Sequence, residues 1–584
     1  MSAADGREDG RVEVAGVAAS LGIALGPVHV VPRGDRARRR RVRDRAAEVR
    51  RLREAIEASR AEIEAARDTL DEETALVLDA QLLMHRDELL VDAAVKAIEE
   101  LGLDAEWAVE RTVDELRQPL LRSDSFYFRE RAEDVAHVGQ HILRHLRGDL
   151  LRLPERPLVL VAADLSPAEA VRLLGDERVL GLVTESGSAT SHTALLARAL
   201  EVPAVVGVAG LLERIEGSPE AVVDGLAGKV VLTPSAEEAA AAAQRSERYR
   251  RFANQLRARA GDAVVSRDGE EVALAANIEL PREAGAACAH GAAGIGLYRT
   301  EFLYLDRDAP PSEEEQRRVY QEVLDACPGR GVTIRTFDLG GDKLPRTARF
   351  DAGPNPALGL RALRLGLRRR EVLRTQLRAV LRAAADREAA LMFPMVSDVG
   401  ELRRARALVR EVEEALDREG LPRGSVRVGA MIEVPSAALL AGQLLAQADF
   451  LSVGTNDLVQ YTLAVDRSNP DVAPLGDPAH PAVLQLLARV VEAGRVHGKP
   501  VAMCGDMAAD PIALPVVLGL GFRRLSMPLG SLPFAQETVR RVAMSELAPL
   551  AEEALAMESG AEVRDRVREQ LRDALGELWV EQGL

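Results

Sequence analysis

The spacing of apolar residues divides the start of the chain into a strand-like segment and a long helical stretch. Residues 16–32, GVAASLGIALGPVHVVP, form a short, glycine-punctuated segment of β character. From residue 34 to about residue 147 helical spacing persists, and strand signals are few. The first long helix is marked by apolar residues on one face, namely Val49, Leu52, Ile56, Ile63 and Leu70. We therefore expect an all-α subdomain over residues 34–147.

Strands that alternate with helices follow from about residue 156. The alternation is carried by the segments RPLVLVAADL, SPAEAVRLL, VLGLVTES, PAVVG and KVVLTP. It predicts an α/β domain that ends at Pro234, after which Ser235 and Glu238 have the spacing of a helix capping box. The Ala- and Arg-rich helix that begins there is polar on most of its circumference, as suits a connector between domains.

The region from residue 263 to residue 584 contains eight short strand-like segments, with helical patterns between most of them. They are ALAANI, GIGLYR, TIRTFD, LMFPMV, VGAMIE, FLSVGT, PVAMCG and RRLSMP. Eight strands in such an alternation predict a (β/α)8 barrel, with an insertion in the long interval between the third and fourth strands. The chain is therefore expected to be a multidomain α/β protein.

Composition adds limits on class and location. A length of 584 residues suggests three or four domains. The net charge of −16 argues against nucleic-acid and membrane-surface partners, so the early arginine run is interpreted as the solvated face of a helix. The cysteines Cys288, Cys327 and Cys504 show no CxxC spacing and predict no disulfide framework, which favours a reducing compartment. Because neither a signal peptide nor a membrane-length apolar run is evident, we expect a cytoplasmic protein.

Polar residues follow the predicted barrel strands at their C-terminal ends, where barrel enzymes carry their active sites. They are Arg299, Glu301, Arg335, Asp338, Glu433, Asn456, Asp457, Arg467, Cys504 and Asp506. Guanidinium groups bind phosphate and carboxylate oxygens, and Glu433 and Asp457 offer the hard oxygen ligands that Mg²⁺ prefers. This chemistry indicates a small phosphorylated carboxylate as ligand. An ion-pair network at the barrel mouth is the structural alternative, and Cys504 fits a buried apolar position as well as a general acid or base.

Two histidine patterns lie outside the predicted barrel. His192 follows small and hydroxylated residues at the start of an apolar helical segment, in SGSATSHTALLARALEVPAVVG. His137, His141 and His145 recur every four residues, a spacing that would let two of them share a metal on one helix face. Because no nearby carboxylate or cysteine completes a recognisable ligand set, a structural role for these three is favoured.

Nearly the whole chain resembles one known family. The segments GIGLYRTEFLYLDRDAPPSEEEQ, RTFDLGGDK, MIEVPSA, SVGTNDLVQYTLAVDRSNP and AMCGDMA are similar to the sequence blocks of enzyme I of the bacterial sugar phosphotransferase system, the phosphoenolpyruvate–protein phosphotransferases. TSHTALLAR resembles the phosphohistidine motif of that family, and ERAEDVAHVG resembles part of its helical carrier-binding subdomain. The chain departs from the family at Ser188 and Ala189, where a glycine and a basic residue are usual. Pyruvate phosphate dikinase and phosphoenolpyruvate synthase share the histidine and barrel motifs, but they also carry a nucleotide-binding domain for which this length leaves no room.

The resemblance implies a swivelling phosphohistidine domain that is interrupted by an all-α subdomain. The expected parts are the first piece of the phosphohistidine domain (1–33), the helical HPr-binding subdomain (34–147), the rest of the phosphohistidine domain (148–235), a connector helix (236–262), and a (β/α)8 barrel that binds phosphoenolpyruvate and dimerises (263–584).

The resemblance also implies a role for each site residue. His192 would accept the phosphoryl group of phosphoenolpyruvate and pass it to a histidine of the carrier protein HPr, which suits the near-neutral pKa of imidazole. The resemblance assigns phosphoenolpyruvate binding to Arg299, Arg335, Asn456 and Arg467, Mg²⁺ binding to Glu433 and Asp457, and protonation of the enolate to Cys504. The chain would be a homodimer.

Two other functions stay open at this point. A non-catalytic regulator that senses phosphoenolpyruvate would keep the fold, and the same chemistry would also serve a nitrogen-regulatory HPr paralogue, although the extra sensory domain typical of such enzymes is not expected here.

The carrier should bind at acidic residues of the helical subdomain, namely Asp71, Glu72, Glu73, Asp79, Asp87 and Glu88. The adjacent Leu82, Leu83 and Met84 would be either the apolar contact or subdomain core.

Overall fold

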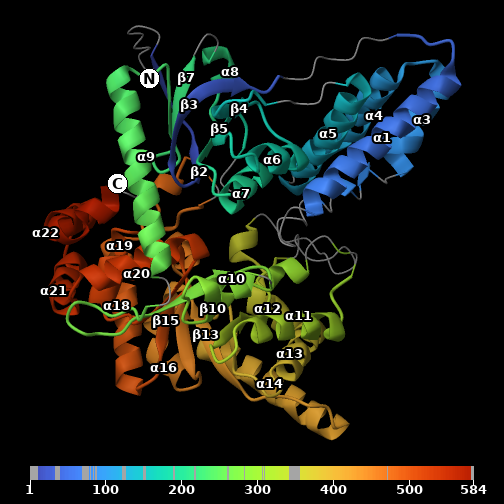
Figure 1. The fold of residues 1–584 in the computed structure, drawn as a ribbon. Coiled ribbons are helices and arrows are strands. Elements are labelled where there is room, and N and C mark those ends of the chain that lie inside the picture. Colours follow the sequence, from blue (N-terminus) through green and yellow to red (C-terminus); the bar gives the residue numbers. More distant parts are fainter. Residues whose placement is uncertain are drawn as a thin grey trace. The chain divides into compact units, whose positions relative to one another are not determined.

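The computed structural model of the chain separates into two compact units, one that ends at Phe252 and one that spans Ala253–Val580 (Figure 1). It describes residues 11–32, 40–68, 78, 81, 82, 84, 85, 88–121, 126–148, 153–187, 191–215, 219–259, 262–281, 283–304, 307, 309–340, 355–467, 469 and 471–580. Along this described chain, no helix combines the length and the apolar character that a membrane crossing requires.

An eight-stranded sheet of order β1-β8-β7-β3-β4-β5-β6-β2 forms the centre of the first unit. Its strands are β1 (Val12–Ala15), β2 (Val17–Ser20), β3 (Ile23–Val30), β4 (Leu158–Ala162), β5 (Val179–Thr184), β6 (Ala204–Val206), β7 (Glu220–Asp224) and β8 (Lys229–Leu232). The β3–β4, β4–β5 and β5–β6 pairs are parallel, and the other pairs are antiparallel. Because β3 pairs with β4, the strands before and after the helical stretch belong to one sheet. The sequence pattern did not predict β7.

The two faces of this sheet enclose separate cores. Leu158, Leu160 and Ala162 of β4 pack with the buried residues of α6 and α7, whereas Val159 and Val161 pack on the opposite side with β5 and β7. The helices that accompany the sheet are α6 (Pro167–Leu174), α7 (His192–Ala199) and α8 (Leu211–Arg214). Burial on both faces explains why β4 reads as a continuous apolar run and not as an alternating one.

The helical subdomain contains α1 (Arg45–Asp68), α3 (Glu88–Leu101), α4 (Ala105–Leu121) and α5 (Phe126–Arg147). The predicted apolar face of the first helix is confirmed, since Leu52, Ile56 and Ile63 are buried. Leu52 and Ile56 belong to the core between the helices, whereas Ile63 packs into the core beneath the sheet. Leu70 lies outside the described residues.

The predicted capping box begins α9 (Ala236–Ala258) as expected. The amide of Glu238 donates to Oγ of Ser235 at 3.2 Å, and the amide of Ser235 donates to the Glu238 carboxylate at 2.9 Å. The boundary between the two compact units falls within this helix, after Phe252.

The second unit is built on the predicted closed barrel of eight parallel strands. These are β9 (Ala273–Ile278), β10 (Ile295–Tyr298), β11 (Val332–Arg335), β12 (Ala389–Phe393), β13 (Val426–Ile432), β14 (Phe450–Val453), β15 (Val501–Met503) and β16 (Arg524–Met527). Each overlaps one of the eight predicted segments, although β11, β12 and β13 begin one or two residues before theirs, and β9 pairs with β16 to close the ring.

Helices follow each strand, and the predicted insertion between the third and fourth strands contains an additional one. The helices are α10 (Glu283–Ala289), α11 (Glu313–Ala326), α12 (Ala362–Arg368), α13 (Arg370–Ala383), α14 (Val399–Glu419), α15 (Pro435–Leu439), α16 (Ala441–Leu445), α17 (Thr455–Leu463), α18 (Pro481–His497), α19 (Ala513–Gly519), α20 (Leu532–Arg541), α21 (Met544–Leu555) and α22 (Gly560–Val580). The insertion supplies α12, which precedes α13 on the chain between β11 and β12.

The expectation that no cysteines pair is wrong. Cys288 of α10 and Cys327, directly after α11, form a disulfide whose Cα atoms lie 6.2 Å apart. Their separation of 39 residues carries no local signal, and only the packing of α10 against α11 brings them together. Cys504 is free and buried. Cysteine usage therefore no longer argues for a reducing compartment.

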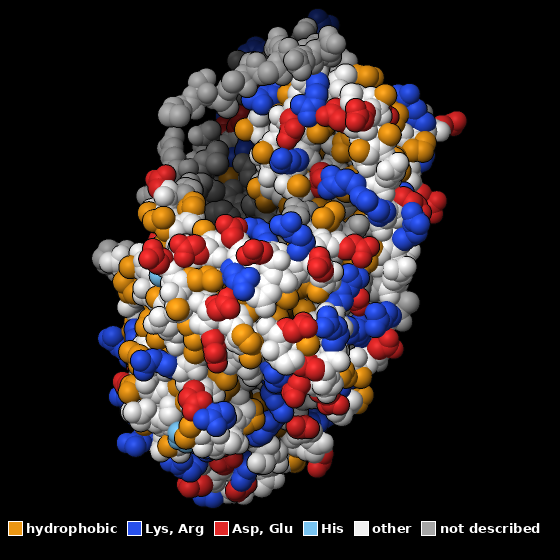
Figure 2. Space-filling model, turned by 90° about the vertical axis from the view of Figure 1, so that its left-hand side faces the viewer, with side chains coloured by type: hydrophobic (Ala, Val, Ile, Leu, Met, Phe, Trp, Pro, Cys, Tyr) orange, Lys and Arg blue, Asp and Glu red, His pale blue; other side chains and the backbone are white. Residues whose placement is uncertain are grey.

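Acidic and basic side chains intermingle over the face drawn in Figure 2. Ion pairs are frequent along the described chain, such as Arg387 with Asp325 at 2.7 Å and Arg423 with Asp417 at 2.7 Å.

Candidate active site

The C-terminal ends of the barrel strands gather the residues that the sequence singled out. Arg335 is the last residue of β11, Glu433 follows β13 directly, and Cys504 follows β15. Asn456 and Asp457 lie in the first turn of α17, after β14. In a parallel barrel all these ends open at one mouth, which is where residues from different strands can act on one ligand.

Arg335 is buried among acidic groups at this mouth. Its Nη2 donates to Oε1 of Glu301 at 2.9 Å, and its Nη1 lies 3.5 Å from Oδ2 of Asp338. Burial opposes the charge of the guanidinium, but the carboxylates of Glu301 and Asp338 outweigh burial and raise its pKa above the ordinary value. Arg335 is therefore a permanent cation, and its Nε is buried without a hydrogen-bond partner among the described residues.

Three carboxylates converge beside Arg335. Ligand oxygens of Asp338, Glu433 and Asp457 all lie within 4.8 Å of one another. Burial, together with the charges of Asp338 and Asp457, raises the pKa of Glu433 well above its ordinary value. Oδ1 of Asp457 is buried and has no hydrogen-bond partner in the described part of the chain. An oxygen-only cluster whose charges repel one another fits a hard divalent cation.

The sequence predicts Glu433 and Asp457 as metal ligands, and the structure places a carboxylate oxygen of Asp338 within 4.8 Å of theirs. Oε1 of Glu433 accepts a hydrogen bond from the amide of Met395 at 2.5 Å, which orients the carboxylate from the end of the neighbouring strand β12. Asp338 lay in the polar ring that the sequence identified, but its position three residues after β11 did not distinguish it from an ordinary ion-pair partner.

Arg361 is a site residue that sequence reasoning missed. Its Nε and Nη2 bind the two oxygens of Asp338 at 3.0 and 2.8 Å, and its Nη2 lies 3.6 Å from Oδ2 of Asp457. Despite burial, which opposes the charge, Asp338 and Asp457 raise the pKa of this guanidinium above its usual range. Arg361 comes from the insertion and not from a strand end, so the barrel rule gives no signal for it. A bridge between Gly340 and Arg361 holds it beside the end of β11.

Cys504 is buried at the end of β15, with only 2% of its surface exposed. Its Sγ lies 3.5 Å from the carbonyl oxygen of Val453, and its own carbonyl accepts from Nδ2 of Asn277 at 3.0 Å. Burial raises the pKa of the thiol to about 11. The thiol is therefore protonated at neutral pH, a state that suits an acid better than a thiolate nucleophile.

The remaining predicted residues have partners of their own near the strand ends. Nη1 of Arg299 donates to Oε1 of Glu279 at 2.6 Å. Asn456 donates to the Asp506 carboxylate at 2.8 Å and accepts from the Asp506 amide at 3.0 Å. Arg467 is the most exposed, at 57%, and its Nη2 lies 3.9 Å from Oδ1 of Asp457.

His192 belongs to the other unit, where it is the first residue of α7. The hydroxyl of Ser191 caps this helix by accepting from the amide of Ala194, and Thr193 donates to the carbonyl of Leu165 at 3.2 Å. Gly187, with φ of 116°, provides the left-handed turn before the helix. Ser188 and Ala189 lie outside the described residues, as does the side chain of His192. The Ser191 cap and the hydrogen bond of Thr193 thus fix the start of α7.

Most of the acidic residues expected to meet a carrier protein also lie outside the described part, namely Asp71, Glu72, Glu73, Asp79 and Asp87, together with the side chain of Glu88. Of their apolar neighbours, Leu82 packs against the core beneath the sheet and Met84 against the helical core. These two residues therefore belong to subdomain core. Leu83 is not described.

Comparisons with known proteins agree on one family. Sequence families described as PEP-utilising enzyme match in three parts: the PEP-binding domain at residues 254–544, the N-terminal domain at 15–131 and the mobile domain at 154–228. A phosphoenolpyruvate-protein phosphotransferase of Geobacillus stearothermophilus is 39% identical over 557 residues, which cover 94% of this chain and 96% of that protein. Proteins of the same name from Listeria innocua (38% identity; 95% and 98% covered) and Bacillus subtilis (37%; 95% and 99%) match over similar lengths.

Proposed function

The chain belongs to the phosphoenolpyruvate–protein phosphotransferase family and is a phosphotransferase, and from this premise we propose that it moves the phosphoryl group of phosphoenolpyruvate to its own His192. A histidine of the carrier protein HPr then accepts the group, as the first step of sugar uptake. The observation that carries the proposal is the buried cluster of Arg335, Asp338, Glu433 and Asp457 beside the protonated thiol of Cys504.

The cations of the barrel mouth bind the substrate in this proposal. Arg299, Arg335 and Arg467 provide guanidinium groups for the phosphate and carboxylate oxygens of phosphoenolpyruvate, and Asn456 provides an amide donor. Arg335 is held ready by Glu301 and Asp338, so little reorganisation is needed when the anion arrives. The exposed Arg467 has the most freedom to close over the ligand.

A Mg²⁺ ion is the proposed cofactor, and the residues present fit it. Glu433 and Asp457 would hold the ion, and Asp338 is the third candidate ligand. The buried Oδ1 of Asp457, which has no hydrogen-bond partner among the described residues, and the mutual repulsion of the carboxylates both favour a cation there. When bound, Mg²⁺ supplies positive charge next to the phosphoryl oxygens.

The chemistry requires one nucleophile and one acid. A ring nitrogen of His192 forms a bond to phosphorus while the bond from phosphorus to the enol oxygen breaks, which leaves the enolate of pyruvate. The thiol of Cys504 gives its proton to the methylene carbon of this enolate, and pyruvate is released. Water returns the proton to Cys504. The high pKa of the buried thiol suits this role, because the proton is present when the enolate forms.

Because His192 and the barrel belong to different units, the phosphohistidine domain must travel between the barrel and HPr. We propose α9, in which the boundary between the units falls, as the hinge. The proposed boundaries remain 1–33, 34–147, 148–235, 236–262 and 263–584. Binding of HPr to the helical subdomain, dimerisation through the barrel and a cytoplasmic location are proposed with the function.

Labelled phosphoenolpyruvate and Mg²⁺ test the proposal directly. We expect acid-labile, base-stable label on the purified chain, its transfer to added HPr, and complete loss of both in His192→Ala. That variant should still bind phosphoenolpyruvate, because the barrel is unchanged. Absence of label on the wild-type chain would favour a non-catalytic sensor instead, and label that moves only to a nitrogen-regulatory HPr paralogue would change the pathway but not the chemistry.

A further inference from the structure

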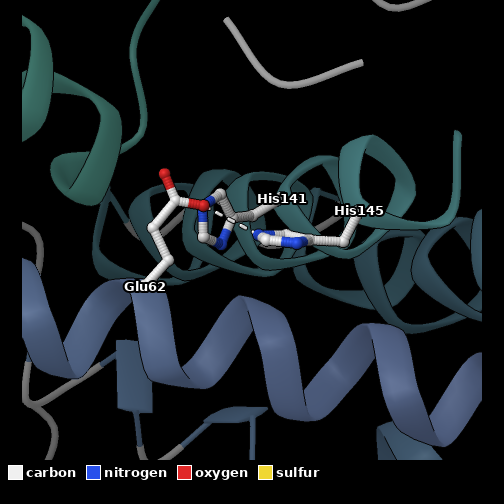
Figure 3. Close-up of side chains that lie close together, drawn as sticks. All are labelled: Glu62, His141 and His145. Carbon is white, nitrogen blue, oxygen red and sulfur yellow. Dashed lines mark hydrogen bonds and ion pairs between the residues drawn. The ribbon is translucent and has the colours of Figure 1, made fainter. Parts of the chain in front are cut away.

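A second group of ligand-bearing side chains lies in the helical subdomain. Glu62 of α1 and His141 and His145 of α5 offer ligand atoms that all lie within 4.8 Å of one another. Figure 3 shows the Glu62 carboxylate directed toward both imidazole rings, which come from successive turns of one helix. Oε2 of Glu62 lies 2.7 Å from Nε2 of His145 and 3.4 Å from Nε2 of His141. Only packing of α1 against α5 brings in the carboxylate that the histidine spacing alone lacked.

The other oxygen of Glu62 has a different partner. Oε1 lies 3.0 Å from Nε of Arg172, which belongs to α6 beneath the sheet. Arg172 thus fixes the plane of the carboxylate from its outer side and leaves Oε2 to face the imidazoles. The third histidine of the series is not part of the group, because Nε2 of His137 contacts Oδ2 of Asp164 at 3.2 Å.

A hydrogen-bond chain behind His141 determines which of its ring nitrogens carries a proton. Nδ1 of His85 lies 2.8 Å from the carbonyl oxygen of Gln81, and because a carbonyl only accepts, this nitrogen is the donor. His85 is buried, and burial lowers its pKa to about 4, so its ring is neutral and its Nε2 accepts. Oγ of Ser59, 2.7 Å away, donates to that nitrogen and accepts from Nδ1 of His141, also at 2.7 Å.

With Nδ1 of His141 as the donor, Nε2 is the ring nitrogen that faces the carboxylate of Glu62. The two atoms lie 3.4 Å apart, a separation that suits a cation bound by both. An imidazole whose far nitrogen donates to an oriented oxygen is the arrangement by which proteins hold histidine ligands to metals.

We propose that Glu62, His141 and His145 bind a divalent transition-metal ion of the Zn²⁺ class. The ion is held through Oε2 and the two Nε2 atoms, and water takes the fourth position. Two nitrogen ligands select Zn²⁺ or Co²⁺ over Mg²⁺, which prefers oxygen alone. Nε2 of His145 binds the ion through its lone pair, so the single proton of the neutral imidazole is then carried by Nδ1. The metal ties α1 to α5, and Arg172 connects the same carboxylate to α6.

Cobalt titration of the full-length protein tests this site. The chain is freed of metal with a chelator and kept in excess Mg²⁺, so that the carboxylate cluster of the barrel is occupied. We expect Co²⁺ to bind with the intense visible bands of a four- or five-coordinate complex and to be displaced by Zn²⁺. His145→Gln and Glu62→Gln should each weaken binding by more than about tenfold, and Ser59→Ala by about tenfold to a hundredfold through loss of His141 orientation.

His137→Gln is the matched control, because it changes a histidine of the same helix about two turns before His145 and leaves the three ligands in place. Its Co²⁺ affinity should equal that of wild type. Absence of the visible bands, or bands that survive His145→Gln unchanged, would overturn the proposal.

X-ray absorption of Zn²⁺ bound to the unaltered chain gives a test that no folding defect can confound. Two imidazoles in the ligand shell are expected. A shell of oxygens alone, or one that contains the sulfur of Cys504, would assign the metal elsewhere and refute the site.

Discussion

Glu433 in the barrel and Glu62 in the helical subdomain each belong to a cluster of three side chains, but their neighbours give them opposite acidities. Burial and the charges of Asp338 and Asp457 raise the pKa of Glu433 well above its ordinary value. The adjacent imidazoles of His141 and His145, with Arg172, hold the pKa of Glu62 far below its ordinary value, although Glu62 is also partly buried. The kind of neighbouring group, and not burial alone, sets the acidity of each glutamate.

The same difference separates what the two clusters can bind. Three carboxylates repel one another, which favours a cation among them, and their oxygens suit Mg²⁺. One carboxylate with two imidazoles already satisfies much of its own charge, and its nitrogens suit softer ions. The first cluster lies beside the guanidinium of Arg335 and the protonated thiol of Cys504, so under the proposed function phosphotransfer should depend on the barrel carboxylates.

Glu433→Gln tests this dependence and should have the largest effect. We expect self-phosphorylation with labelled phosphoenolpyruvate to slow by about 10²–10³-fold, because the cation that offsets phosphoryl charge is held less well. Glu313→Gln is the matched control: Glu313 is also ion-paired, with Arg378 and Arg382 at 2.6 Å each, but on the helices outside the barrel. Equal rates for the two variants would contradict the role of the carboxylate cluster.

Cys504 allows the acidity of the barrel mouth to be measured. Burial raises the pKa of this thiol to about 11, so its thiolate fraction at pH 8 should be about a hundredfold below that of an ordinary cysteine. Because a raised pKa keeps the thiol protonated, iodoacetamide should label Cys504 slowly at pH 8, and labelling should accelerate up to about pH 11. The chain unfolded with its disulfide intact provides the reference. A labelling midpoint near pH 8.5 in the folded protein would contradict a raised thiol pKa at the barrel mouth.

Arg361→Lys should have a smaller effect, on stability as well as on activity. Lysine cannot reproduce the two hydrogen bonds to Asp338, so the free energy of unfolding of the barrel should fall by about 1–3 kcal/mol. Arg387→Lys removes the same paired geometry from the exposed Asp325 and should cost less than about 1 kcal/mol. Urea unfolding followed by fluorescence of Trp579, which is buried in α22, measures both. Equal losses would mean that burial of the Arg361–Asp338 pair has no energetic consequence.

The barrel and most of its site could be predicted because the barrel topology alone brings the strand ends together. Once eight apolar segments form a parallel barrel, every residue that follows a strand comes to the same mouth, so Arg335, Glu433 and Cys504 could be identified one strand at a time. No knowledge of packing between distant helices was needed.

Two of the features that sequence did not predict depend on such packing. Glu62 meets His141 only through the register of α1 against α5, and Cys288 meets Cys327 only through α10 against α11. Arg361 reaches Asp338 from an insertion that has no place in the repeating pattern. Strand β7 was missed as well, because its short apolar core gave no clear alternation.

Arg172→Gln should have the smallest effect and separates the two clusters by their exposure to solvent. Arg172 is 35% exposed and Glu62 23% exposed, so their ion pair is partly screened and its loss should cost about 1 kcal/mol or less. High salt should reduce this cost, whereas the cost of Arg361→Lys should change little because its partner Asp338 is buried. Unfolding of the first unit is followed by fluorescence of Trp107, which packs against the helical core, in a chain that carries Trp579→Phe. A salt-independent loss in Arg172→Gln would show that Glu62 lies in as protected an environment as the barrel carboxylates, and the contrast between the two clusters would then rest on their ligand types alone.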